Sequence, residues 1–165
     1  MRTLMTLAVL ATTLLGAPPA AASTDGFASI LQPYEAVRQA LVADDLGAAR
    51  APAAALAEAI GHLRHHATAG TAGVPAEKLE EVRALFPEIA SATAELAAAT
   101  DLAAARDAFY ALSKPLVRWR QAAGEGPAVV YCPMKERSWL QPAGEAIGNP
   151  FNGQKMASCG QVVAR

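Results

Sequence analysis

The sulfur atoms of this chain are distributed unevenly. Beyond residue 22 they all lie near the C-terminus, at Cys132, Met134, Met156 and Cys159. Methionines that fill gaps in a core are usually scattered among the helices. Their pairing with the only two cysteines instead indicates a soft donor set of two thiolates and two thioethers. Such a set suits Cu(I) better than Mg, Ca or Mn, and it suits zinc less because zinc sites use cysteine and histidine.

The spacing of these residues predicts that each pair faces one way. Cys132 and Met134 follow the strand-like run 128–131 (AVVY), and residues two apart on a strand share a side. Residues 156–159 (MASC) are predicted to form one helical turn, on which residues three apart share a face. We expect the turn at Asn149 and Pro150 to bring the pairs together, and Gly153 and Gly160 to shape the backbone around them.

A Cys132–Cys159 disulfide is the alternative. An exported protein with two cysteines usually oxidises them, and closing this loop would add roughly 3–4 kcal/mol of stability. The methionines would then be ordinary packing residues, and the protein a non-enzymatic interaction module. From residue chemistry alone the disulfide is favoured over a metal site, and the two states would interconvert because an oxidised pair supplies no thiolates.

Three histidines form a second, weaker candidate metal site. His62, His65 and His66 have helical i, i+3 and i+4 spacing, which would place them on one face. The alternative is a solvated cluster near a helix C-terminus, where cationic side chains are favoured by the helix dipole. We favour that alternative.

The sequence contains few features that indicate an enzyme. It has no Cys-x-x-Cys-His for haem, no Gly-x-Ser-x-Gly elbow, no phosphate-binding glycine loop for a nucleotide and no His-Glu-x-x-His. A thiol oxidoreductase would need Cys-x-x-Cys, and Cys159 as a nucleophile would need a nearby histidine. We therefore expect no catalytic residues. Trp139 is expected to anchor the tail in the core rather than to shield a cation with its ring.

The N-terminus predicts export. Arg2 precedes an apolar run over residues 4–15, and residues 16–22 are small and end in Ala-x-Ala. This is the pattern of a secretory signal peptide, residues 1–22, cleaved after Ala22. The apolar run is too short for a spanning helix, so we expect no membrane span after cleavage. The whole chain has a formal net charge of −1, which gives no indication of nucleic-acid binding.

The fold class expected is mainly α. Apolar residues at three- and four-residue spacing predict helices over residues 27–43, 46–67, 75–98 and 102–121. Residues 69–74 are predicted to be a glycine-rich loop, Pro52 to kink or delay its helix, and Pro87 to kink the third helix. Short connections favour an up-and-down four-helix bundle over residues 23–123. Residues 124–165 would form a short strand, a turn and a helical turn, packed on the bundle through Trp139, Leu140, Ile147 and Phe151.

The tail also resembles a known family. Cys132 to Met134, Trp139-Leu140, residues 147–153 (IGNPFNG) and Met156 to Gly160 are similar to the motif of a family of bacterial periplasmic domains of unknown function. Residues 40–46 (ALVADDL) and 106–113 (RDAFYALS) resemble stretches of its helices. That family occurs alone and fused to the adaptor subunits of heavy-metal efflux pumps. The resemblance implies a periplasmic protein that binds copper or another soft metal, with an efflux adaptor as a possible partner, and it favours metal over the disulfide.

Overall fold

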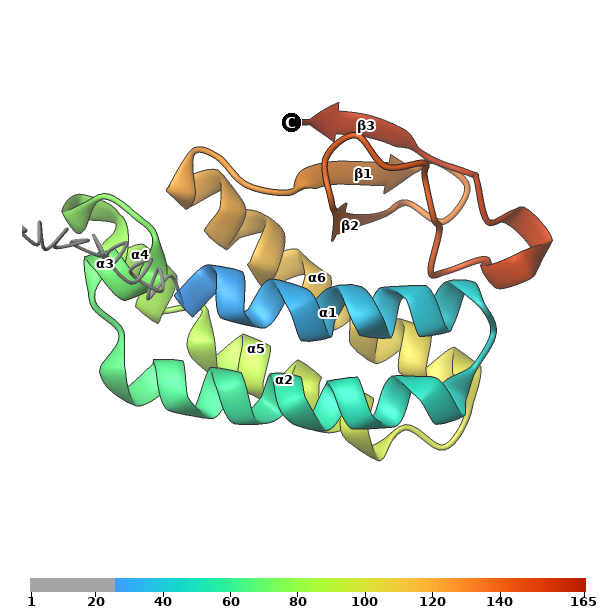
Figure 1. The fold of residues 1–165 in the computed structure, drawn as a ribbon, viewed down its shortest axis with the longest axis horizontal. Coiled ribbons are helices and arrows are strands. Elements are labelled where there is room, and N and C mark those ends of the chain that lie inside the picture. Colours follow the sequence, from blue (N-terminus) through green and yellow to red (C-terminus); the bar gives the residue numbers. More distant parts are fainter. Residues whose placement is uncertain (1–25) are drawn as a thin grey trace, which may run out of the picture.

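A computed structural model describes residues 26–165, and the predicted signal peptide lies outside them. The chain is mainly helical, as expected, and it ends in a small antiparallel sheet (Figure 1). None of the helices in this range is long and apolar enough to cross a membrane.

The first two helices follow the sequence closely. α1 (Gly26–Val42) buries its apolar stripe, and α2 (Leu46–His66) starts where Asp45 accepts a hydrogen bond from the Ala48 amide at 2.9 Å. The expectation that Pro52 delays this helix is wrong. The cap at Asp45 starts the helix first, and Pro52 then costs only one backbone hydrogen bond within it.

Residues 69–98 differ from the prediction. The expected loop contains a short helix, α3 (Ala69–Ala72), which Thr68 and Thr71 cap reciprocally and Gly73 ends with a positive φ of 62°. The expected helix 75–98 is broken into η1 (Ala76–Lys78), α4 (Leu79–Arg83) and α5 (Phe86–Ala98). The break has a local cause, because the ring of Pro87 is incompatible with a helical carbonyl four residues earlier, at Arg83.

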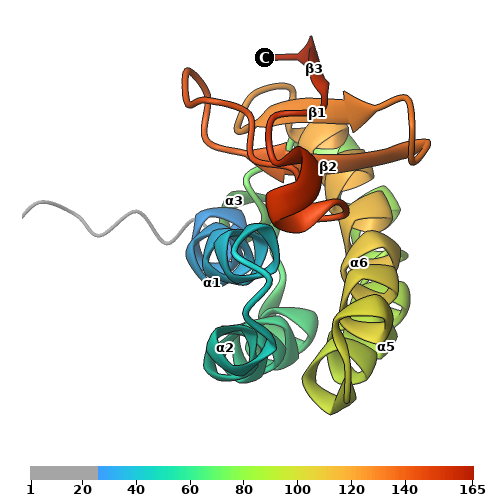
Figure 2. The same ribbon diagram turned by 90° about the vertical axis from the view of Figure 1, so that its right-hand side faces the viewer.

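The long helices pack in chain order. α6 (Leu102–Ala123) begins at the Asp101 cap and ends at Gly124, whose φ is +82°. α1 packs on α2, α2 on α5 and α5 on α6. Seen end-on, α1 and α2 form one side of the helical part, α5 and α6 form the other, and the sheet covers the edge formed by α1 and α6 (Figure 2).

The C-terminal segment forms three strands where the sequence predicted one. β1 (Ala128–Cys132) lies between β2 (Arg137–Gln141) and β3 (Gln161–Ala164), antiparallel to both. The predicted helical turn 156–159 is also wrong in detail. A 3₁₀ helix, η2 (Gly153–Met156), ends at Met156, and the following turn is closed by a 3.1 Å bond from the Cys159 amide to the Met156 carbonyl.

The tail shares the core of the helices, as predicted. Trp139, Leu140 and Phe151 are buried, and Ile147 packs against them. Tyr34 of α1 links the two parts: its hydroxyl lies 2.7 Å from that of Ser113 on α6 and accepts a hydrogen bond from the Leu140 amide at 3.2 Å. The sulfur-bearing segment is thus attached to the helices through the buried residues of β2 and the loop that contains Phe151.

Candidate metal centre

The two cysteines meet at the junction of β1 and β3. Cys132 is the last residue of β1, and Cys159 lies just before β3, whose Gln161 pairs with Tyr131. Both thiols are free, and their sulfur atoms are 3.3 Å apart. A disulfide requires about 2.05 Å, whereas two sulfur ligands bonded at about 2.3 Å to a tetrahedral metal lie about 3.8 Å apart. The 3.3 Å distance lies between these two values, so a small movement of the sulfur atoms would allow either a disulfide or a shared metal ion.

The two thiols differ in proton affinity. Burial raises the pKa of Cys132, but hydrogen bonds from the Cys159 thiol, the backbone amides of Lys135 and Met134 and the Asn149 side chain outweigh it, so the net pKa is lowered. The same sulfur contact and burial raise the pKa of Cys159. The Cys132 thiol therefore loses its proton more readily than the Cys159 thiol.

The methionines lie at the surface. Met134 is in the turn between β1 and β2 and is 65% exposed, and Met156 at the end of η2 is 39% exposed. The structure thus brings the cysteine sulfurs together but leaves both thioethers on the exposed rim. Within residues 26–165, no three histidine, cysteine, aspartate or glutamate side chains form a group that could hold a metal. A centre with more than two sulfur donors here would draw on methionine or on a donor from outside the chain.

Asn149 fixes the loop that carries Cys159. Its side-chain oxygen accepts hydrogen bonds from the amides of Phe151 (2.8 Å) and Asn152 (3.2 Å). Its side-chain nitrogen donates to the Cys159 carbonyl at 2.6 Å, and its backbone amide donates to Ala157 at 2.6 Å. The turn at Asn149 and Pro150 therefore positions Cys159 directly. The side-chain nitrogen of the neighbouring Asn152 donates to the Cys132 sulfur at 3.8 Å.

At both glycines of the motif, Gly153 and Gly160, the surroundings leave no room for a side chain. Gly153 has a φ of +54°, and a Cβ there would collide with Asp44 and Arg106. A Cβ at Gly160 would lie 2.9 Å from the ring of Trp139 and 3.0 Å from Val130. Trp139 is fully buried, packs edge-on against Phe151 at 5.8 Å, and donates its indole hydrogen to Gln141. Its ring therefore anchors the tail and supports the backbone next to Cys159.

Sequence reasoning missed the contacts that hold this segment on the helices. Arg106 of α6 donates to the carbonyls of Pro150 (2.8 Å) and Leu41 (3.0 Å) and forms an ion pair with Asp44. Asp44 accepts a hydrogen bond from the Gln154 amide at 3.1 Å. These hydrogen bonds hold the pKa of Asp44 below its usual value. The signal was present, because Asp44 and Arg106 lie in the two helical stretches that resemble the periplasmic family.

The three histidines do not form one site. The rings of His62 and His66 are 4.9 Å apart, whereas His65 lies 3.4 Å from the Arg64 guanidinium. The structure therefore brings together two of the three imidazoles. They lie on α2, on a different element from the sulfur pair.

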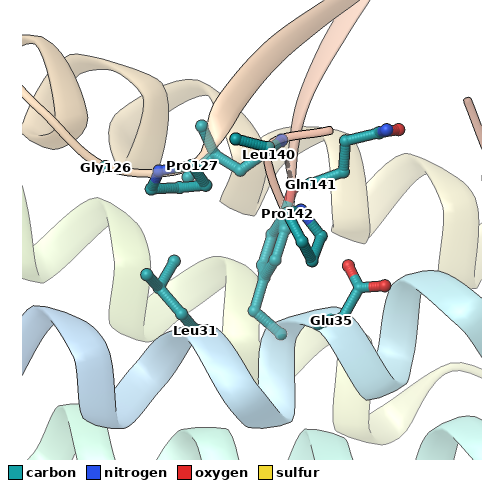
Figure 3. Close-up of a pocket in the computed structure, with 9 residues that line it drawn as sticks. Leu31, Glu35, Gly126, Pro127, Leu140, Gln141 and Pro142 are labelled. Atoms are coloured by element: carbon teal, nitrogen blue, oxygen red, sulfur yellow. Dashed lines mark hydrogen bonds between the residues drawn. The ribbon is translucent and has the colours of Figure 1, made fainter. Parts of the chain in front are cut away.

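A cavity of about 380 Å³ lies between α1 and β2. Leu31 and Glu35 face it from α1, across from Pro127, Leu140 and Pro142 (Figure 3). Its wall is almost entirely apolar and contains no sulfur. It is therefore separate from the candidate centre.

Comparison with known proteins places the helical part in a family. Residues 30–127 match the family described as "Protein of unknown function (DUF3347)". The chain belongs to this family. The DUF3347 match ends just before β1, so the cysteines and methionines of the tail lie beyond it. No curated protein and no solved structure matches the chain.

Proposed function

We propose that this protein is an exported, periplasmic soft-metal carrier, with Cu(I) as its metal, that acts without catalysis in copper or heavy-metal tolerance. The observation that carries the proposal is the Cys132–Cys159 pair, whose sulfurs are 3.3 Å apart and in which hydrogen bonds lower the pKa of Cys132. Two converging thiolates are a soft donor set for Cu(I). The tail's resemblance to domains fused to efflux adaptors makes such an adaptor the proposed partner.

Each donor has a distinct role in this proposal. Cys132, the thiol with the lowered pKa, binds first, and Cys159 loses its proton as the second thiolate forms. Met156 and Met134, at the exposed rim, supply thioether donors when metal is present. The long helices serve as a four-helix scaffold that holds the tail through Arg106 and Tyr34.

The test is an anaerobic Cu(I) titration of the reduced protein against a chromophoric chelator. We expect one tightly bound equivalent, which is lost in the variant Cys132→Ser/Cys159→Ser. A His62→Ala/His66→Ala variant is the matched control and should bind as the unmodified protein does. Failure of the unmodified protein to compete with the chelator would overturn the proposal.

The competing function is an interaction module whose tail is closed by a Cys132–Cys159 disulfide. The short sulfur distance favours this state as well, since an exported protein meets oxidising conditions. The methionines separate the two functions. Met134→Leu/Met156→Leu keeps side-chain volume, so it should leave a disulfide-bonded module unchanged and weaken Cu(I) binding by a metal carrier.

A further inference from the structure

A second, smaller cavity lies beside the segment that carries Met156, and its two lysines have no role in the proposed metal binding. It has a volume of about 300 Å³. Met156 forms part of its wall, and so does Asn152, whose side-chain amide lies 3.8 Å from the Cys132 sulfur. Its wall is completed by Asp44, Arg106, Lys135, Phe151 and Lys155. A ligand seated here would contact the Asn152 side chain, which in turn contacts the buried Cys132 sulfur.

The cavity is cationic although the chain as a whole has a net charge of −1. Three of its side chains are cations and only Asp44 is an anion. Arg106 is engaged by Asp44 and by two backbone carbonyls. Lys135 and Lys155 are exposed, and within residues 26–165 neither forms an ion pair. Two ammonium groups are therefore available to an anionic ligand.

The two lysines suggest which complex of Cu(I) the protein receives. Cu(I) prefers soft thiolate ligands, so it reaches a periplasmic protein bound to another thiol rather than as a free ion. A small thiol that carries a carboxylate would place its anionic end between the lysines and its metal-bearing sulfur toward the cysteines. Ammonium groups bind carboxylates through charge-assisted hydrogen bonds.

We infer that the cavity lined by Lys135, Lys155 and Met156 binds the carboxylate of a small thiol that delivers Cu(I) to Cys132 and Cys159. The inference rests on the proposed metal-binding function. Transfer is a ligand exchange without redox change: two Cu–S bonds to the cysteines form as the two Cu–S bonds of a bis-thiolate donor complex break. The protons that leave the cysteine thiols pass to the departing donor thiolates, and copper stays Cu(I).

The experiment compares two donors that differ in charge. Cu(I) is presented anaerobically as its complex with 3-mercaptopropionate, which carries a carboxylate, or with 2-mercaptoethanol, which is neutral. We expect the protein to take the metal about tenfold faster from the carboxylate donor, since steering charges raise association rates by 10-fold or more. In the variant Lys135→Gln/Lys155→Gln the two rates should converge to within about twofold.

The matched control is Arg64→Gln/Lys78→Gln, which removes the same charge near α3 and α4, at the other end of the helices (Figure 1). It should keep the donor preference. Equal rates from both donors in the unmodified protein, with Cu(I) still bound at equilibrium, would overturn the cavity's role and leave the proposed function standing. No uptake from either donor would overturn both.

Discussion

At the residue scale, Cys132 and Cys159 titrate as a pair rather than as two ordinary thiols. One proton shared over a 3.3 Å contact stabilises the first thiolate and opposes the second. The pair therefore holds one negative charge between a lowered and a raised pKa. This intermediate charge state has one sulfur ready for a metal and one proton to release on binding.

Ultraviolet titration of the reduced protein near 240 nm tests this state. Thiolate absorbance should rise in two steps, one below and one above the usual thiol pKa of about 8.5. In Cys159→Ala the remaining step should lie higher than the first step of the unmodified protein, because Cys132 has lost its hydrogen-bond donor. In Cys132→Ala the Cys159 step should move down from the upper step. A single step for two equivalent thiols would contradict the assignment.

Gly160 gives a second prediction at the residue scale. Gly160→Ala places a methyl group 2.9 Å from the ring of Trp139, in the backbone next to Cys159. Overpacking of a rigid core costs about 1–3 kcal/mol, so the free energy of unfolding in urea should fall by this amount. Gly61→Ala is the control, because a Cβ there meets nothing within 4 Å and the helix gains about 0.5–1 kcal/mol. Equal stability of the two variants would contradict the packing argument.

At the element scale, the tail depends on contacts that link it to two helices. The Arg106 side chain on α6 reaches both the tail, at Pro150, and the end of α1, at Leu41. Asp44 has a positive φ of 59°, a conformation that places it beside Arg106 and the Gln154 amide. Arg106 therefore connects α1, α6 and the loop before η2.

Removal of Arg106 should loosen the tail. Arg106→Ala removes the donor from two backbone carbonyls and from one of the two carboxylate oxygens of Asp44. Hydrogen bonds to charged groups are worth about 1.5–3 kcal/mol each. We expect the free energy of unfolding in urea to fall by about 2–4 kcal/mol. Arg118→Ala on the same helix is the control, since its exposed 3.4 Å pair with Glu88 is worth about 0–1 kcal/mol. Similar losses in both variants would show that Arg106 does not hold the tail.

At the level of single elements, the sequence predicted the helices whose spans are determined by local apolar spacing and capping residues, and it did not predict the strands that depend on pairing. The spans of α1, α2 and α6 followed from apolar spacing and from the caps at Asp45 and Asp101. β2 and β3 did not, because each is only four or five residues long and is stabilised by pairing with β1 rather than by its own pattern. The same limit applies to the site. The motif pointed to Cys132 and Cys159, whereas Arg106 and Asp44 are 62 residues apart and meet only in the folded chain.

At the scale of the whole molecule, the family match and the packing suggest different boundaries. The match ends at residue 127, which separates the helices from the tail. The core does not divide there: Phe151 packs against Phe109 of α6 at 6.1 Å, and Tyr34 of α1 bonds to Leu140 of β2. Because these contacts are buried and shared, we expect helices and tail to unfold together.

The two tryptophans allow this to be measured, because each lies in one of the two parts. Trp119 packs between Phe27 and Phe86 within the helices, and Trp139 packs in the sheet. In Trp119→Phe, fluorescence reports only Trp139 while far-ultraviolet circular dichroism reports the helices. A single cooperative unit predicts coincident urea midpoints for the two signals. The variant Trp139→Phe, with Trp119 as the reporter, should show the same agreement. If Trp139 fluorescence were lost at lower urea while the helical signal persisted, the tail would be a separate unit docked on stable helices, and the metal centre could open without unfolding them.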